Sequence, residues 1–313
     1  MPAADHSNPV STSSTGTHSP TLSRRGLLKA GAAAIAGIAL GKAASAAASP
    51  AAALGPILGT VLDYSAGVPS AASVRAAGHL GAVRYVSRRR PGAEWMRGKP
   101  VLLPETQDFA RNGLAVASVY QFGKADTADW KQGGPGAAVH APQAIAIHAA
   151  AGGPTGRPIY VAIDDNPSRW QYDNQIRAYL QAFRAQLAAA GLRLGVYGNY
   201  NVIDWCIADG LGEYFWQHDW GSQGRIHPHT TIHQKAGLQT HVGGILVDIN
   251  NVYAHDWGQW TPGSTINELP VIPGDAPEIP IPDLSQLDLS KLAAGSSDAA
   301  NGSSTLLQQF TPR

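Results

Sequence analysis

Residues 160–167 read "YVAIDDNP", an apolar run that ends abruptly in two aspartates and an asparagine. The apolar part, residues 160–163, is typical of a strand covered on both faces, as parallel strands are. The helix predicted to follow has a cap of its own, because Ser168 and Gln171 form a capping box. The polar cluster is therefore not needed to start that helix. This favours a second interpretation, in which the cluster lines a site at the end of the strand.

Short apolar runs like this one recur along the middle of the chain, and helical stretches separate several of them. The predicted strands are 57–63, 82–87, 114–121, 158–164, 192–198, 213–217, 230–234 and 244–249, and the predicted helices include 69–77, 137–151 and 175–190. Alternating strands and helices predict an α/β fold with a parallel sheet. Eight strands predict a small (β/α)8 TIM-like barrel, with short or missing helices between the last strands. An open doubly wound sheet is the alternative.

Polar and aromatic residues end all eight predicted strands. In a (β/α)8 barrel the functional residues lie at the C-terminal ends of the strands. Strand alternation puts Asp164 on the same face as Asn166, and Asp248 on the same face as Asn250. Asp63 ends the first strand, next to the eighth if the barrel closes. The predicted catalytic residues are Asp63, Asp164 and Asp248. The predicted substrate-binding residues are Arg84, Tyr85, Tyr120, Gln121, Asn166, Tyr197, Asn199, Trp216, Gln217, Gln234 and Asn250. For each aspartate, the alternative is a residue that only satisfies a turn.

The composition argues against some partners. The net charge is +1 and only 14% of residues are charged, with no basic stripe, so nucleic-acid binding has no electrostatic support. The 8 Trp and 10 Tyr suit stacking on flat sugar faces, although large aromatics also simply pack cores. The single cysteine, Cys206, is predicted to be a small buried hydrophobe. The sequence has no Gly-rich phosphate loop, CxxC pair or haem motif, and no cofactor is predicted.

A histidine-rich stretch, "HPHTTIHQ" at residues 227–234, raises the question of a metal site. It offers His227, His229 and His233, and His-x-His is a known zinc pair. No carboxylate at ligand spacing accompanies these histidines. The stretch is therefore predicted to be a solvent-exposed loop, and no metal is predicted.

The two ends of the chain differ from its middle. Arg24 and Arg25 precede a weakly apolar stretch, 27–40, and Ala-x-Ala sites follow at 44–46 and 46–48. This layout predicts a cleaved signal recognised by the twin-arginine export machinery, with no membrane span left after cleavage. From residue 262, Pro, Ser and Gly recur without an apolar period, which predicts an extended tail. The predicted organisation is a disordered N-terminus and export signal (1–54), a barrel (55–261) and a disordered tail (262–313), in a protein located in the cell envelope or outside the cell.

Several motifs together resemble one known family. They are "LDYSAGVPSAASVRAAG" (62–78), "VYQFGKADTADW" (119–130), "GVYGNY" (195–200), "YFWQHDWG" (214–221) and "VDIN" (247–250), besides the opening stretch. The chain resembles the secreted actinobacterial glycoside-hydrolase-like domain of unknown function found in twin-arginine-exported mycobacterial proteins, over about residues 57–260. That domain is distantly similar to family-25 lysozymes. The resemblance implies a (β/α)8 barrel that acts on bacterial cell-wall glycan.

The resemblance also implies roles for particular residues. In the lysozymes the fourth strand ends Asp-x-Glu, and the glutamate donates the proton; Asp164 matches the aspartate, but Asn166 falls on the glutamate. Asp63 and Asp248 match other acids of the lysozyme cleft. The pair Trp216 and Gln217 matches its sixth-strand Trp-Gln pair.

The asparagine is a departure from the lysozyme pattern, because an amide cannot donate a proton as a carboxylic acid does. Three alternatives remain. Asp164 is the acid, with its pKa raised by the charge of Asp63 or Asp248. A substrate N-acetyl group is the nucleophile, oriented by Asn166. Or the barrel only binds carbohydrate. The sequence and the resemblance together predict an exported glycoside-hydrolase-like protein that acts on or binds cell-envelope polysaccharide, peptidoglycan or a related glycan, with acid-assisted hydrolysis of a glycosidic bond if it is active. A non-catalytic carbohydrate-binding barrel is the alternative.

Overall fold

The computed structural model describes residues 54–264 of the 313-residue chain. The predicted twin-arginine signal lies outside the described residues, and so does the predicted tail from residue 265 onward. Within residues 54–264, no helix is long and apolar enough to span a membrane.

Eight strands close into one barrel in the order in which they follow one another along the chain. They are β1 (Gly59–Asp63), β2 (Gly81–Tyr85), β3 (Ala115–Tyr120), β4 (Pro158–Ala162), β5 (Arg193–Gly198), β6 (Tyr214–His218), β7 (Ile232–Val242) and β8 (Ile245–Val252). Successive strands from β1 to β7 pair in parallel, so their C-terminal ends meet at one mouth of the barrel.

The last strand departs from the predicted (β/α)8 TIM-like barrel. β8 runs antiparallel to both of its neighbours, β7 and β1. Gly243 and Gly244, at φ 56° and 80°, form a two-residue turn from β7 into β8, and such a turn joins antiparallel strands. In the described part of the chain, no helix lies between β6 and β7 or between β7 and β8. The predicted (β/α)8 barrel is therefore wrong: the protein is a closed barrel of mixed strand direction, α/β in class.

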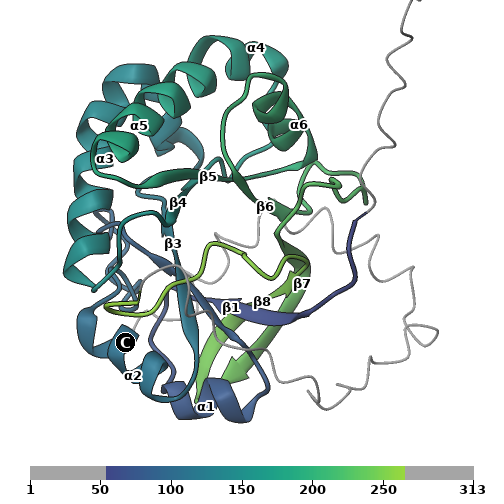
Figure 1. Ribbon diagram of the computed structural model, residues 1–313. Helices are drawn as coiled ribbons and strands as arrows, with labels where there is room; N and C mark the ends of the chain where they lie inside the picture. Colours follow the sequence, from purple (N-terminus) through teal and green to yellow (C-terminus); the bar gives the residue numbers. More distant parts are fainter. Residues whose placement is uncertain (1–53, 265–313) are drawn as a thin grey trace, which may run out of the picture. The chain divides into compact units, whose positions relative to one another are not determined.

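Helices occupy the connections between the earlier strands. They are α1 (Ala71–Ala76), α2 (Leu103–Arg111), α3 (Gly133–Ala150), α4 (Arg169–Gln171), α5 (Arg177–Ala189) and α6 (Tyr200–Ala208), with 3₁₀ turns at Ala125–Thr127 and Asp129–Gln132 and a π-helical stretch, Tyr172–Ile176, between α4 and α5. The predicted capping box is present, because the Ser168 hydroxyl accepts from the Gln171 N–H and the Gln171 side chain accepts from the Ser168 N–H. Figure 1 shows α3 and α5 side by side on one flank of the barrel.

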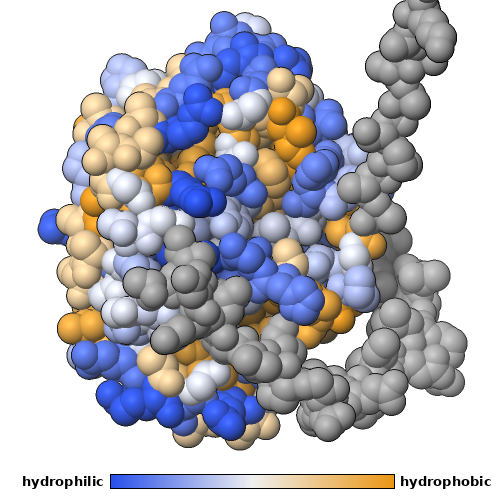
Figure 2. All heavy atoms as spheres, viewed as in Figure 1, coloured by the Kyte–Doolittle hydropathy of each residue, from blue (hydrophilic) through white to orange (hydrophobic). Residues whose placement is uncertain are grey.

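Strand alternation divides the buried side chains into two cores. One fills the barrel interior, and its members include Val61, Val83, Ala117, Tyr160, Trp216 and Ile232. The other lies between the barrel and the helices, and its members include Leu62, Val116, Ile159, Leu180, Phe183 and Val196. Full burial of a large apolar side chain stabilises the fold by about 1.5–3 kcal/mol. The described surface visible in Figure 2 mixes hydrophilic and apolar residues without one continuous apolar face.

Candidate active site

A cavity of about 420 Å³ opens at the barrel mouth, a volume typical of small-ligand pockets. The closed barrel brings all three predicted catalytic aspartates to it, from strands that are far apart in the sequence. The sequence-predicted site residues that line the cavity are Asp63, Tyr85, Gln121, Asp164, Tyr197, Trp216, Gln234 and Asp248.

Asp63 ends β1 and is only 2% exposed. Its Oδ2 accepts hydrogen bonds from Nδ2 of Asn250 at 2.8 Å and from Nε2 of Gln234 at 2.9 Å. Both donors are amide N–H groups, and both hydrogen bonds end on Oδ2. When the carboxyl group is protonated, its proton therefore lies on Oδ1. Burial raises the pKa of Asp63 well above its usual range, and the charge of Asp248 raises it further. Asp63 is thus a carboxyl group beside the cavity whose surroundings favour its protonated form.

Two short hydrogen-bond chains orient Asp63. Tyr197 donates from its hydroxyl to Oε1 of Gln234 at 2.5 Å, and Trp216 donates from Nε1 to Oδ1 of Asn250 at 2.8 Å. The two aromatic rings also contact each other, with centroids 4.3 Å apart. The amides that bind Asp63 are therefore held in turn by a packed aromatic pair.

Asp248 lies directly opposite Asp63 in the antiparallel β1–β8 ladder. Side chains opposite each other in such a ladder have their Cβ atoms about 4.5–5.5 Å apart. Burial raises the pKa of Asp248, although a 2.8 Å hydrogen bond from Nε2 of Gln239 works against this; the charge of Asp164 raises it further. Two carboxyl groups this close resist simultaneous ionisation, so the pair retains a proton more easily than a lone aspartate.

Asp164, which follows β4, is in the opposite electrostatic situation. Its Oδ2 accepts from Nζ of Lys124 at 2.9 Å and from Nε2 of Gln121 at 3.0 Å. Burial alone would raise the pKa of Asp164, but Lys124 foremost, together with His218 and Gln121, holds the pKa below its usual value. This is the reverse of the raised pKa considered from the sequence. Asp164 is the carboxylate of the site.

The segment that carries Lys124 is itself fixed in place. The buried carboxylate of Asp129 accepts the backbone N–H groups of Phe122 and Gly123 at 2.8 Å and 2.7 Å. A Cβ atom at Gly123 would lie 1.7 Å from the carbonyl oxygen of Thr127, so only glycine fits this close approach. The position of the lysine beside Asp164 therefore depends on the connection that follows β3.

His218 lines the cavity although the strand pattern did not single it out. It lies two residues after Trp216 on β6, so alternation places both on the inner face. Its Nε2 is 3.4 Å from the carbonyl oxygen of Ile163, and within residues 54–264 its buried Nδ1 has no partner. Burial lowers the pKa of His218 despite the nearby Asp164 charge, which favours the neutral ring. With Nε2 donating to the carbonyl, Nδ1 is a buried acceptor without a partner among the described residues.

The remaining lining residues come mostly from connections between strands. The lining residues not singled out from the sequence are Ser65, Arg90, Trp95, Met96, Lys99, Val119, Lys124, His218, Asp219, Trp220, Lys235, Ala236, Gly237 and Gln239. Alternation was a sufficient signal for Val119 and His218. For residues on the connections, no periodic pattern states which side chain turns toward the mouth.

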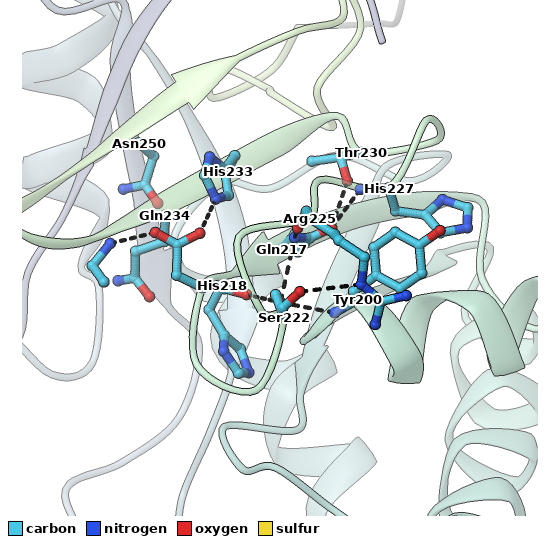
Figure 3. A network of polar contacts seen from close by, with 12 residues as sticks. Tyr200, Gln217, His218, Ser222, Arg225, His227, Thr230, His233, Gln234 and Asn250 are labelled. Atoms are coloured by element: carbon cyan, nitrogen blue, oxygen red, sulfur yellow. Dashed lines mark hydrogen bonds and ion pairs between the residues drawn. The ribbon is translucent and has the colours of Figure 1, made fainter. Parts of the chain in front are cut away.

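Three predicted substrate-binding residues point away from the cavity because they alternate with residues that line it. Tyr120 bonds through its hydroxyl to Nδ1 of His140 at 2.6 Å, on the helix side of the barrel. Gln217 donates from Nε2 to the carbonyl oxygen of Arg225 at 2.7 Å, and its Oε1 accepts the N–H of His227 at 2.8 Å (Figure 3). Gln217 therefore braces the connection between β6 and β7.

The third of these residues is Arg84, which is fully buried. It forms an ion pair with Glu105 and donates to the carbonyl oxygens of Tyr64 at 2.8 Å and Gly98 at 2.6 Å. A buried arginine with all these partners has a positioning role in the fold and is not free to bind a ligand. Its bond to Gly98 ties down the connection between β2 and α2.

The predicted asparagines also lie outside the cavity lining. Asn166 is exposed, and its Oδ1 accepts from Nδ2 of Asn199 at 2.9 Å. Asn199 caps α6, accepting the N–H of Val202 at 2.9 Å. Asn250 is opposite Val61 in the β1–β8 ladder, below Asp63, and acts on the cavity through its bond to that aspartate.

The histidine-rich stretch is not the solvent-exposed loop that the sequence predicts, because His227 and His233 are buried and His233 lies on β7. His227 and His229 have ring centroids 5.6 Å apart, and Nε2 of His227 is 3.6 Å from Oδ1 of Asp204 on α6. His233 instead bonds to Asp219, with Nε2 2.5 Å from Oδ1. Among residues 54–264, no group of three or more His, Cys, Asp or Glu side chains is arranged to hold a metal ion.

Comparison with known proteins places this barrel in a family. Residues 72–253 match the family described as "Rv2525c-like, glycoside hydrolase-like domain". Over 241 residues, the chain is 49% identical to the "Putative peptidoglycan hydrolase Rv2525c" of Mycobacterium tuberculosis. The aligned residues are 77% of this chain and 99% of that relative. Crystal structures of the Tat-secreted protein Rv2525c from the same organism, in complex with HEPES and with L-tartrate, match with TM-scores of 0.62 and 51% identity, over 65% of this chain and 100% of theirs. These findings confirm the resemblance seen in the motifs, and the relative's export route agrees with the predicted twin-arginine signal. The chain belongs to the Rv2525c-like, glycoside hydrolase-like family.

Proposed function

We propose that the protein binds a polysaccharide of the cell envelope, peptidoglycan or a related glycan, and hydrolyses a glycosidic bond in it with acid assistance. The observation that carries the proposal is that the aspartates at one cavity have pKa values shifted in opposite directions. Burial and mutual repulsion favour a proton on the Asp63–Asp248 pair, whereas Lys124 keeps Asp164 ionised. Glycoside hydrolysis uses one protonated carboxyl group and one carboxylate. The description of the M. tuberculosis relative supports peptidoglycan as the glycan.

In the proposed reaction, Asp63 is the general acid. The proton on its Oδ1 passes to the glycosidic oxygen as the bond between that oxygen and the anomeric carbon breaks. The carboxylate of Asp164 completes the reaction in one of two ways. As a nucleophile it bonds to the anomeric carbon, and water then hydrolyses that bond; as a base it takes a proton from a water molecule whose oxygen bonds to the anomeric carbon. Gln234 and Asn250 keep Asp63 oriented through both steps.

Exposed aromatic side chains beside these acids support a sugar as the ligand. Trp95 is 52% exposed and Trp220 is 56% exposed, and both line the cavity. They lie on the connections after β2 and β6, which are four strands apart in an eight-stranded barrel and therefore on opposite sides of the mouth. Large amphipathic rings exposed beside a polar cavity suit the apolar faces of sugar rings.

A second candidate function, a non-catalytic carbohydrate-binding barrel, is favoured by one observation. By the resemblance of the motifs to lysozymes, Asn166 falls where those enzymes have their proton-donor glutamate, and in the structure it is bonded to Asn199 outside the cavity lining. That bond also argues against Asn166 orienting a substrate N-acetyl group.

We further propose that residues 1–54 direct export through the twin-arginine machinery, that residues 55–261 form the domain that binds glycan, and that residues 262–313 form an extended tail. The Arg24-Arg25 pair with its Ala-x-Ala sites supports the first proposal, together with the Tat-secreted relative. The protein would then meet its polysaccharide in the cell envelope or outside the cell.

Incubation of the purified protein with peptidoglycan, and separately with arabinogalactan, tests the enzymatic function. We expect new reducing ends with the wild-type protein and their loss in Asp164→Asn. Asp165→Asn is the matched control, because Asp165 accepts a hydrogen bond from Trp130 and does not line the cavity. Saturable binding without new reducing ends would instead establish the binding barrel, and neither binding nor turnover would refute both functions.

A further inference from the structure

One connection supplies a group of cavity residues that the proposed chemistry does not use. The segment between β2 and α2, residues 86–102, contributes Arg90, Trp95, Met96 and Lys99 to the lining. The aspartates come from strand ends and from β8. This connection therefore brings two cations and an exposed tryptophan to a cavity whose three aspartates come from other segments.

Lys99 is the unusual member of this group. It is only 3% exposed, yet within residues 54–264 it forms no ion pair. Its Nζ donates to the carbonyl oxygen of Gln121 at 2.6 Å and lies 4.2 Å from the ring centroid of Tyr85. A buried ammonium without a counter-charge is costly, and buried charges in proteins are normally paired. The charges of Asp129 and Asp164 favour the ammonium, but neither aspartate forms an ion pair with it among the described residues, so a ligand's charge would be its first direct partner.

Arg90 is the second cation without a carboxylate. It is half-buried, and in the described part of the chain its recorded side-chain contact is with the sulfur of Met96 at 3.9 Å. Burial lowers the pKa of Lys99 to about 7, and the charge of Arg90 is the next cause. The two cations therefore lie close enough to repel each other, and a shared anion would relieve that repulsion.

The end of the connection that carries Lys99 is held firmly. Arg84 donates to the carbonyl oxygen of Gly98 at 2.6 Å, and the N–H of Gly98 donates to the carbonyl oxygen of Ser65 at 2.8 Å. A Cβ atom at Gly98 would lie 2.5 Å from the carbonyl oxygen of Gly67, so the backbones approach more closely than any other residue allows. Lys99 is thus built into the cavity wall, which is what a binding residue requires.

We propose that Lys99 and Arg90 form a subsite for a carboxylate carried by the glycan, with Trp95 beside the sugar ring that bears it. The forked guanidinium of Arg90 suits the two oxygens of a carboxylate. Elsewhere in the lining, Asp164, Asp219 and Asp248 disfavour an anion, and of the two other lysines there Lys124 is bound to Asp164, which leaves Lys235 as the one further cation among the described lining residues. This inference rests on the proposed function and specifies its substrate class: an acidic sugar unit, with either a lactyl ether or a uronate as the source of the carboxylate.

Binding measurements by isothermal titration calorimetry at pH 6 test the subsite. The full chain carries Asp63→Asn, so that the glycan is not consumed and no new charge is introduced. The first probe is peptidoglycan glycan chains freed of peptide by an amidase, whose lactyl carboxylates are exposed. The second is the same chains with their carboxyl groups reduced to alcohols, and the third is hyaluronan oligosaccharides, which carry uronate.

We expect at least one carboxylated chain to bind about 10-fold or more tightly than the reduced chain, as a charge-assisted hydrogen bond implies. Tight binding of the first probe identifies the lactyl source, and tight binding of hyaluronan identifies the uronate source. Lys99→Met and, separately, Arg90→Gln should reduce the preference to about 3-fold or less. Arg89→Gln, a neighbouring exposed arginine that does not line the cavity, should leave it unchanged. Arg90 is half-buried, so the Arg90→Gln result stands even if Lys99→Met fails to fold.

Two results would overturn the subsite and leave the proposed function intact: equal binding of reduced and carboxylated chains, or a preference that survives both substitutions. Failure of every glycan to bind would overturn the proposed function and the subsite together.

Discussion

The aspartates on the two sides of the barrel mouth lie in different electrostatic surroundings. On the β1–β8 side, Asp63 and Asp248 face each other across an antiparallel ladder, and within residues 54–264 neither forms an ion pair. On the β3–β4 side, Asp164 is bound by Lys124 and by Gln121. The same residue type therefore has a raised pKa on one side and a lowered pKa on the other.

The backbone arrangement explains this difference. An antiparallel ladder places two residues directly opposite each other on one face, so two aspartates at that level must share one environment. On the other side, the chain leaves β3 through a connection, and its lysine reaches back to the aspartate that follows β4. Pairs of acids whose environments separate their pKa values are the arrangement that glycosidases use for acid and base roles.

The largest expected effect comes from removing the acid of the β1–β8 side. Asp63→Asn keeps the size of the side chain and an oxygen for Gln234 and Asn250 but removes the proton donor. We expect the rate of reducing-end release to fall by about 10²–10⁴-fold, as for the loss of a general acid. Turnover assays of the variant beside the Asp165→Asn control measure it. A loss below about 3-fold would contradict the acid role of Asp63.

The next effect concerns the cation of the β3–β4 side. Lys124→Met removes the charge that keeps Asp164 ionised, so the pKa of Asp164 should rise and the acidic limb of the pH–rate profile should move to higher pH. We expect a rate loss of about 10–100-fold at acidic pH and a smaller one at neutral pH. Lys131→Met is the control, because Lys131 pairs with an exposed aspartate, Asp126, 3.5 Å away. An unchanged acidic limb would show that another group keeps Asp164 ionised.

A third prediction concerns stability. Because the pKa of Asp63 is raised in the folded state, its contribution to stability is fully present below the unfolded pKa, about 3.9, and is lost as the pH rises through the folded pKa. At pH 8 an aspartate is ionised in the unfolded chain, whereas in the native protein the buried Asp63 must either stay protonated or carry a buried charge. Both cost folding free energy, and Asp63→Asn removes that cost. We expect the variant to be more stable than the wild type at pH 8 by about 1 kcal/mol, or roughly 2–4 °C in melting temperature.

Chemical denaturation of both proteins from pH 4 to pH 8 checks the sign. The difference between variant and wild type isolates Asp63, since groups with lowered pKa values, such as Asp164 and Asp256, change stability in the opposite direction in both proteins. A difference that is constant with pH would mean that Asp63 titrates normally.

The positions of the strands could be predicted from the sequence, but the direction of one could not. All eight predicted strands agree with the observed ones to within three residues, except that β7 continues to Val242, because short apolar runs bounded by polar residues mark buried strands. An apolar run does not state its direction. The pair Gly243-Gly244 does indicate a two-residue hairpin turn and hence the antiparallel direction of β8. The predicted strand 244–249 includes Gly244 and so hides this turn. Asp248 reaches the mouth because the register sets it opposite Asp63, whereas Asn250 lies one layer below.

For the candidate site, the limit of prediction follows from the same geometry. Tyr85 and Trp216 line the cavity, so their strand neighbours Arg84 and Gln217 cannot, and alternation alone could have separated the two pairs. Lys99 and Lys124 lie on connections, where the direction of a side chain is decided by distant partners such as Arg84 and Asp129. Those contacts are not local in sequence, so the spacing of residues along the chain does not predict them.

The smallest expected effects come from a matched pair of glutamines, one on each side of the mouth. Gln234 donates to Asp63 and Gln121 donates to Asp164, so each stabilises the ionised form of its aspartate. Replacement of either by leucine should raise the pKa of its partner, but the consequences differ. In Gln234→Leu the acid keeps its proton to higher pH and the basic limb of the pH–rate profile moves up, whereas in Gln121→Leu the acidic limb moves up and the active range narrows. We expect rate changes of about 3-fold at the optimum, since one hydrogen bond is lost in each case. If both substitutions moved the same limb, the two sides of the mouth would not have separate acid and base roles.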